Sequence, residues 1–430
     1  MDTISAPATD PADYRDQFIP MRKADILKGL LDGGTLPDLE QQEKFRQLCR
    51  LLGSIFHYEY FEQLERLRGD YFYFNPQLDM QTRFEPMVLD DAYADLTDAL
   101  TKVLKGANFV ALSEREIEEA HRQRPFLRVN VKAPVQDFRD VRFFRRGRHK
   151  ARMPLRRWFG LYRKSIDVEV FDDVVLLVAM KPMSAMKHKW ELRRMSERGI
   201  RPGAVFIKYF RNIRHMDLAT LFPNVRVVMS RLDRLMLWIP AVVLGTPLVM
   251  KVVSTISVLI IVLGFYFGLW AAVDQQQFNG ALAAAGALTA LIGFLMTQWV
   301  KYERRSLKYQ KQITDNVYFH NINNNAGIFD YIIGAAEEQE CKEAFLAYYF
   351  LLTAKTPPDQ AVLDAQVEDW LKKNFGLDID FEVDDALAKL ERLGVLQRHA
   401  DKLSVLGLDE ALARLDHRWD NFFTFNRAVA

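Results

Sequence analysis

Two long apolar runs without any charged side chain constrain this chain more than any other feature of its sequence. They are residues 252–273 and 281–300, and the short polar stretch 274–280 separates them. A helix of about 20 residues rises ~30 Å, which is the hydrocarbon thickness of a bilayer. We therefore predict a transmembrane helical hairpin at residues 252–300. The alternative is a buried helix pair in a soluble protein, where helices are rarely so long and so free of charge.

A third apolar run, residues 235–250, precedes the predicted hairpin and contains Pro240, Gly245 and Pro247. Only Lys251 separates this run from the first predicted span, which leaves no residues for a turn. We interpret residues 235–251 as an interfacial apolar segment that leads into the bilayer.

The cations beside the hairpin predict its orientation, because positive residues favour the cytoplasmic side of a membrane. The connecting loop has no cation, whereas both flanks are basic. The flanking cations are Arg226, Arg231, Arg234, Lys251, Lys301, Arg304, Arg305, Lys308 and Lys311. We expect a multi-pass protein of the cytoplasmic (inner) membrane with both termini in the cytoplasm.

Each predicted span also contains two small residues four positions apart. They are Gly264 and Gly268 in the first span, and Gly286 and Ala290 in the second. Small residues at this spacing allow helix backbones to approach closely. The pairs would serve either the packing of the hairpin on itself or a homo-oligomer that forms through Gly264 and Gly268.

Outside the hairpin the periodicity of the apolar residues changes along the chain. Residues 15–110 carry apolar side chains at three- and four-residue spacing, which predicts helices. Alternating or valine-rich stretches then predict strands of a mostly antiparallel sheet at 127–132, 166–170, 174–178, 205–210 and 225–228. Asp172 and Asp173, between two of these strands, indicate a hairpin turn.

The region after the second span is predicted to be helical. No Gly or Pro occurs from Tyr302 to Asn316, so one helix is expected from about Ala281 to near His320, and a further helix is expected over 328–354. Residues 359–425 then have the helix, helix and strand-pair order of a winged-helix module. The second helix of this module is acidic, which disfavours nucleic acid as a partner because phosphates would be repelled.

The expected architecture is an α+β soluble N-terminal domain, a two-helix transmembrane hairpin and a helical C-terminal region ending in a winged-helix-like module. The expected boundaries are a disordered N-terminus at 1–14, the cytoplasmic α+β domain at 15–230, the interfacial segment at 235–251, the hairpin at 252–300, a long helix with a helical hairpin at 301–355, and the winged-helix-like domain at 359–425.

Four short signatures support a family resemblance. They are 170–178 with Lys181 and Pro182, 218–224, the Asn-rich 318–327 and the Glu-rich 336–343. Together they resemble the transmembrane protein 143 family, which is built on the domain of unknown function numbered 3754. The resemblance covers roughly residues 15–425. It implies a two-span membrane protein and supplies no activity, cofactor or catalytic residue.

The Glu-rich segment is the most enzyme-like feature of the sequence. Glu337, Glu340 and Glu343 recur every three residues, and His320 lies upstream. Glutamates one helical turn apart, together with histidine, are ligands of carboxylate metal sites in helical bundles. However, neither the Glu-rich segment nor His320 belongs to a Glu-x-x-His motif, and such sites use two copies of it. These four residues are therefore the candidate metal ligands, and a solvated helix face is the alternative.

A basic segment at residues 142–164 mixes ten Arg and Lys residues with five aromatic residues. Such mixtures suit anionic lipid surfaces and nucleic acid, and a solvated loop is a third interpretation. Because a membrane-tethered protein always has headgroups nearby, we expect anionic membrane lipids as the partner. The residues expected at the lipid surface are Arg145, Arg146, Arg148, Lys150, Arg152, Arg156, Arg157 and Trp158.

The sequence lacks the usual catalytic motifs. It has no Gly-rich phosphate loop, no Gly-x-Ser-x-Gly and no His-Glu-x-x-His. We therefore expect a membrane-anchored scaffold or interaction protein with a lipid-facing basic segment. The alternative is a metal-dependent membrane-bound enzyme that uses the carboxylate-rich helix.

Overall fold

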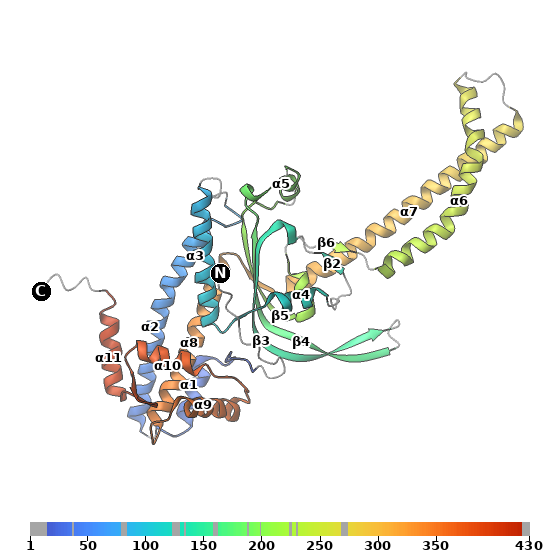
Figure 1. Cartoon of the computed structure of the whole chain (residues 1–430). Helices are drawn as coiled ribbons and strands as arrows, with labels where there is room; N and C mark the ends of the chain where they lie inside the picture. Colours follow the sequence, from blue (N-terminus) through green and yellow to red (C-terminus); the bar gives the residue numbers. More distant parts are fainter. Residues whose placement is uncertain are drawn as a thin grey trace. The chain divides into compact units, whose positions relative to one another are not determined.

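The computed structural model describes residues 15–36, 38–78, 84–122, 130–132, 135–157, 162–186, 189–197, 199–222, 226–228, 231–267 and 274–423 (Figure 1). The chain divides into two compact units. The first combines Met1–Glu114, Gln136–His215 and Asn321–Ala430, and the second combines Arg115–Val135 and Met216–His320.

Helices from both ends of the chain share the core of the first unit. They are α1 (Lys23–Asp32), α2 (Leu39–Phe72), α3 (Pro86–Gly106), α8 (Gly327–Thr353), α9 (Gln360–Phe375), α10 (Val383–Arg392) and α11 (Leu408–Asp420). Helix α8 contacts α1, α2, α3, α9 and α10, and its Phe329, Ile332 and Tyr348 are fully buried. A helix covered on all sides carries apolar residues around its whole circumference. The helices predicted within 15–110 and over 328–354 are confirmed.

The C-terminal elements have the predicted order. Helices α9 and α10 are followed by the strand pair β8 (Leu396–His399) and β9 (Lys402–Val405). Gly394, with φ 73°, ends α10 in the left-handed conformation that favours glycine. These elements share one hydrophobic core with α1 to α3, since Leu387 and Leu390 belong to the same buried cluster as Leu52.

The first unit also contains an antiparallel five-stranded sheet in the order β1-β3-β4-β5-β7. Its strands are β1 (Val110–Ala111), β3 (Phe138–Arg157), β4 (Tyr162–Met180), β5 (Val205–Arg214) and β7 (Asn321–Asn324). The expectation of a mixed protein with an antiparallel sheet is therefore confirmed. Helix α5 (Lys189–Ser196) is a smaller element of this unit. The second unit contains most of α4 (Glu114–Arg122) and the strand pair β2 (Asn130–Lys132) with β6 (Arg226–Val228). Short 3₁₀ turns lie at Val135–Asp137, Met183–Ala185 and His215–Thr220.

The hairpin turn predicted at Asp172 and Asp173 is wrong, because β4 passes through both residues as one strand. The carboxylate of Asp173 is buried and forms an ion pair with Arg146 of the adjacent strand. An aspartate can remain inside a strand when a neighbouring strand neutralises its charge.

Strands β3 and β4 continue beyond the rest of the sheet as a two-stranded ribbon (Figure 1). Strand β5 pairs with β4 only from Val170 onward, so residues 150–157 and 162–169 pair with each other alone, and Arg148 and His149 lie at their base opposite Phe171 and Val170. We call residues 148–157 and 162–169 the ribbon arm. Gly147 precedes it with φ 68°, a conformation that bends β3 at little cost only in glycine.

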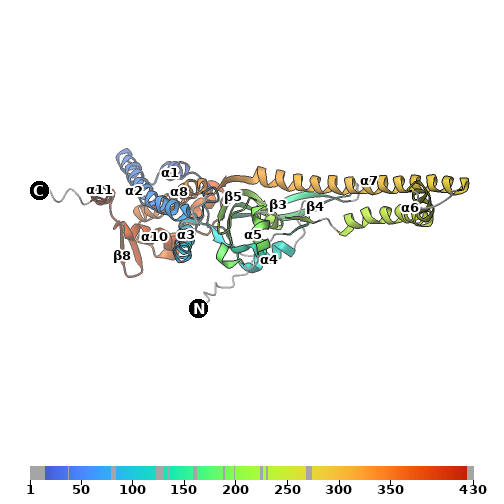
Figure 2. The ribbon, with the colours of Figure 1, turned by 90° about the horizontal axis from the view of Figure 1, so that it is seen from above.

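The second unit contains α6 (Arg231–Tyr266) and α7 (Gln275–His320), which lie side by side in both ribbon views (Figures 1 and 2). A methyl group added at Gly245 would lie 3.3 Å from the ring of Phe294, so the helices are in close contact there. Helix α6 passes through Lys251 without a break, and the interfacial position of residues 235–251 stays a prediction. The long helix predicted from about Ala281 to near His320 is confirmed as α7.

Among the described residues, one helix is long and apolar enough to cross a membrane, Phe278–Arg304 within α7. The two pairs of small residues that were predicted to allow close helix contact differ in their burial. Gly264 is buried, whereas Gly268 lies outside the described residues. Gly286 and Ala290 are exposed, and nothing lies within 4 Å of a methyl group added at Gly286.

We predict that Gly147→Ala destabilises the protein, whereas Gly69→Ala does not. The left-handed backbone at Gly147 costs a residue with a side chain about 1–2 kcal/mol, and the added methyl group would lie 2.7 Å from Cγ of Asp172. Gly69 lies within α2 and has open space around it, so alanine there should add about 0.5–1 kcal/mol. Thermal unfolding of both purified variants checks this. If the Gly147→Ala and Gly69→Ala variants had equal melting temperatures, the left-handed bend assigned to Gly147 would be contradicted.

Candidate functional site

The Glu-rich segment lies on α8, and α8 carries its polar side chains into the core of the first unit. Gln339, Lys342 and Glu343 are 0%, 4% and 1% exposed. Charged groups this deeply buried are costly unless each has a partner of opposite charge or a hydrogen bond. The partners of these side chains therefore decide what the segment can do.

Lys389 of α10 is the centre of the first polar cluster. Its ammonium group lies 2.5 Å from a carboxylate oxygen of Glu343, 2.7 Å from Asp385 and 3.2 Å from Glu340. The hydroxyl of Tyr60, on α2, donates to Glu340 at 3.0 Å. One buried cation thus joins carboxylates from two helices.

The carboxylate of Glu343 accepts further hydrogen bonds. The side-chain amide of Asn108 donates to Glu343 at 3.2 Å, and that of Gln339 donates at 3.1 Å. Asn108 also donates to the backbone oxygen of Gln17 at 2.8 Å, which ties the N-terminal segment to this cluster. Both amides donate to Oε1 of Glu343, whereas Lys389 pairs with Oε2, so both carboxylate oxygens have partners.

The electrostatics of the cluster follow from burial opposed by charge. Burial alone would lower the pKa of Lys389, but Glu343, Glu340 and Asp385 together raise it, so the ammonium stays protonated. Burial raises the pKa of Glu340, and Lys389 opposes that shift. Burial also raises the pKa of nearby Glu382 to about 7, and the charges of Glu343 and Asp385 add to this.

These contacts bear on the candidate metal ligands. Glu340 and Glu343 converge on Lys389, so a protein cation already occupies the position where a metal ion would have to sit. Glu337 faces other partners, His57 at 2.8 Å and Lys23 at 3.5 Å. His320 is the last residue of α7, in the second unit. Across the described ranges, no three His, Cys, Asp or Glu side chains form a group that could hold a metal ion.

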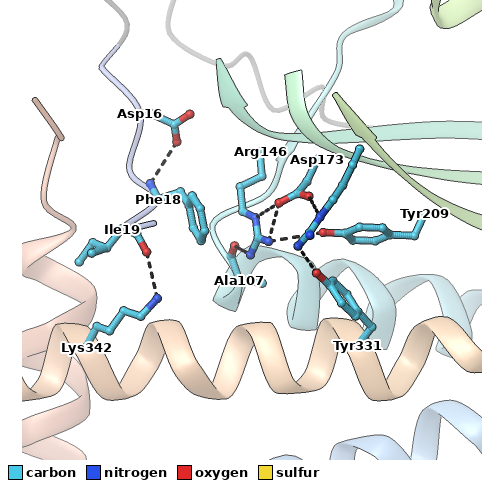
Figure 3. Close-up of polar contacts among 10 residues, drawn as sticks. Asp16, Phe18, Ile19, Ala107, Arg146, Asp173, Tyr209, Tyr331 and Lys342 are labelled. Atoms are coloured by element: carbon cyan, nitrogen blue, oxygen red, sulfur yellow. Dashed lines mark hydrogen bonds and ion pairs between the residues drawn. The ribbon is translucent and has the colours of Figure 1, made fainter. Parts of the chain in front are cut away.

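A second polar cluster surrounds Arg146 of β3 (Figure 3). Its guanidinium donates to Asp173 of β4 at 2.6 and 3.0 Å and to the backbone oxygen of Ala107 at 3.3 Å. The rings of Phe18 and Phe109 lie over it, with centroids at 4.0 and 4.6 Å. This environment satisfies both the charge and the planar faces of the guanidinium.

The Arg146 cluster extends to α8 through a second arginine. Arg211 of β5 donates to the other carboxylate oxygen of Asp173 at 3.1 Å and also to the hydroxyl of Tyr331. Farther along α8, Lys342 donates to the backbone oxygen of Ile19 at 2.9 Å (Figure 3). The sheet, α8 and the N-terminal segment are thereby joined by polar contacts.

The prediction of a lipid surface is wrong for Arg145 and Arg146, because their side chains are only 6% and 4% exposed. The guanidinium of Arg145 lies 5.4 Å from the ring centroid of Phe171. Both arginines fall where β3 is covered by the rest of the first unit. Their burial could not be read from a segment that is basic throughout.

The remaining residues of that prediction belong to the ribbon arm or follow it. Arg148 pairs with Glu169 of the opposite strand, and Arg152 pairs with Asp167 at 3.4 Å. Lys150 is exposed. The backbones of Arg156 and Arg157 belong to β3, and Trp158 lies outside the described residues. Their contact with lipid stays a prediction.

Sequence reasoning missed Lys389 and Asp173, the two charges on which the clusters depend. Each carried a signal. Asp173 interrupts a strand of otherwise apolar residues, and Lys389 lies beside the buried Ala386 and Leu390 of α10. A charge next to the buried face of an element indicates a paired core residue as readily as a functional one.

We predict that Lys389→Met destabilises the protein by about 3–5 kcal/mol, because Glu343 and Glu340 would stay buried without a cation. The matched control is Lys402→Met. Lys402 is 56% exposed and its ion pair with Asp359 is 3.5 Å long, so its removal should cost no more than about 1 kcal/mol. Thermal or denaturant unfolding distinguishes the two. Similar small losses would show that the cluster contributes little.

Comparison with known proteins adds one finding. Residues 171–327 match the family model described as "Protein of unknown function (DUF3754)". No solved structure matches the chain. The matched stretch begins in β4 and ends at the start of α8, so it contains β5, α6, α7 and β7. The name transmembrane protein 143 is not confirmed, but the resemblance to the domain is: over residues 171–327, this chain carries the domain of unknown function DUF3754.

Proposed function

We propose that this protein is a membrane-anchored scaffold or interaction protein, with α6 and α7 as a hairpin that spans the bilayer. The proposal rests on the apolar stretch Phe278–Arg304. Only 17% of the most apolar part of this stretch is buried. Large apolar side chains along it are open to the surroundings: Leu282, Ile292, Leu295, Met296 and Trp299 are 54–67% exposed. Soluble proteins rarely leave such a surface uncovered.

The contacts and exposure of α6 support its role as a second membrane-spanning helix. Because Gly245 touches Phe294, the apolar stretch of α6 runs beside the apolar stretch of α7. Val243, Val253 and Ile260 of α6 are 60–65% exposed, as expected for a lipid-facing helix. Lys251 opposes insertion by ~3 kcal/mol, but more than ten Leu, Ile and Val residues around it each favour insertion by ~0.3–0.6 kcal/mol. The apolar residues outweigh the one charge.

The metal-dependent enzyme is the weaker candidate. It needs carboxylates of α8 that are free to bind a metal ion, whereas Glu340 and Glu343 are bound to Lys389. The scaffold proposal needs no such freedom, because the paired charges would serve the stability of the first unit. Association of copies through Gly264 and Gly268 stays a separate prediction.

Cysteine labelling in a variant without Cys49 and Cys341 tests the topology. The basic flanks predict that a cysteine at position 277 reacts only from the outer face. Cysteines at positions 150 and 400 should react only from the cytoplasmic face. Labelling of 150 and 400 on opposite sides would require an odd number of spans and exclude the hairpin. Release of the protein from membranes by alkaline carbonate would exclude the anchor itself.

We also propose that the ribbon arm rests on anionic headgroups. Residues 148–169 contain seven Arg and Lys residues against Asp167 and Glu169, so cations remain after both carboxylates are paired. Each cation near an anionic surface contributes ~1 kcal/mol. A two-stranded ribbon that carries such an excess can lie along a membrane surface.

An environment-sensitive fluorophore at Ala151→Cys tests the arm in the full-length, reconstituted protein. We predict a blue shift in nanodiscs with anionic lipid but not in neutral nanodiscs. The shift should vanish at 1 M salt, where the Debye length is ~3 Å. It should weaken in Lys150→Gln/Arg156→Gln/Arg157→Gln and persist in the remote control Lys402→Gln. Equal shifts in neutral and anionic lipid would contradict lipid docking, and quenching by RNA at matched salt would favour nucleic acid.

A further inference from the structure

A groove of about 650 Å³ lies in the first unit among α1, α2, α8 and α11. Its apolar walls include Leu27, Phe61, Phe345 and Trp419. Its basic side chains are Lys23, Arg46, Arg50 and His57. Within the described part of the chain, no Asp or Glu lines it. The groove thus combines apolar walls with basic side chains and no lining carboxylate among the described residues.

Arg50 differs from the other basic residues of the groove. Lys23 and His57 both pair with Glu337, which lies outside the lining, and Arg46 pairs with Glu43 at 3.3 Å. For Arg50, no carboxylate among the described residues lies within ion-pair distance, and its side chain is exposed. Its guanidinium is therefore available to an external anion.

The interior of the groove is open because of two small residues and an exposed aromatic wall. Gly53 has no side chain to fill it, and the small, buried Cys49 also lines it. Phe61 is 50% exposed and Trp419 is 40% exposed. Covering these rings with an apolar ligand would remove apolar area that otherwise faces water, which favours binding.

We propose that this groove binds a single-chain anionic amphiphile. A carboxylate or phosphate head would pair with Arg50, and the apolar chain would lie along Phe61, Phe345 and Trp419. The volume falls within the range of small-ligand pockets, and such pockets combine apolar walls with a few placed polar groups. Arginine is suited to either head because its planar fork binds both anions in a bidentate manner. This site is independent of the proposed membrane anchor.

Quenching of Trp419 by brominated amphiphiles tests the site in the full-length protein, reconstituted in neutral nanodiscs. The probes are 11-bromoundecanoate, 11-bromoundecyl phosphate and the uncharged 11-bromoundecanol. We expect saturable quenching by the anions, and loss of that component in Trp419→Phe, which separates it from tryptophans near lipid. Arg50→Gln should weaken anion binding about tenfold. The tighter of the two anions identifies the head that the groove prefers.

The matched control is Arg66→Gln, on the same helix but outside the groove, which should bind the anions as the unaltered protein does. Equal quenching by the alcohol and the anions would overturn the proposal, because the charge would then play no part. So would an unchanged affinity in Arg50→Gln. Displacement of the probe by an acidic peptide at lower concentration than by either anion would also overturn it and assign the groove to a protein partner.

Discussion

The structure of the first unit depends on the compensation of charges that α8 carries into its core. Helix α8 contacts α1, α2, α3, α9 and α10 and buries every residue from Cys341 to Tyr349, yet this stretch contains Lys342 and Glu343. Uncompensated, each would cost several kcal/mol. Glu343 is paired by Lys389 from α10, and Lys342 by the backbone of the N-terminal segment. The Lys342–Ile19 contact joins parts of the chain that are 323 residues apart.

The same compensation explains how the sheet is attached. Asp173 lies between Arg146 and Arg211, and Arg211 reaches Tyr331 at the beginning of α8. A buried aspartate with two arginines leaves one excess cation, which the rings of Phe18, Phe109 and Tyr331 partly accommodate. Phe18 belongs to the N-terminal segment. Sheet, segment and α8 therefore form one connected polar layer within an otherwise apolar core.

The sequence was sufficient wherever local periodicity decides the structure. The helices of residues 15–110, the long helix α7 and the C-terminal order of helices and strand pair follow from spacing and from Gly394. The sequence was insufficient where a contact with a distant part of the chain decides the structure. The spacing of Glu337, Glu340 and Glu343 correctly predicted a helix, but the partners of these carboxylates come from α1, α2 and α10. Likewise, a basic run does not reveal that Asp167, Asp173 and Glu169 lie across from it. The domain division stays a prediction, although α10 and α2 share a core.

The central claim is that the carboxylates of α8 serve the fold by pairing with Lys389, and a double-mutant cycle tests it most directly. The cycle compares Lys389→Met, Glu343→Met and the double variant by equilibrium unfolding. The account predicts that the double variant loses less free energy of unfolding than the sum of the two single variants, by at least ~2 kcal/mol. The reason is that it removes both charges of the Lys389–Glu343 pair, whereas each single variant leaves one of them without its partner. Strictly additive losses would contradict the account, since they would mean that Lys389 and Glu343 contribute to stability independently of each other.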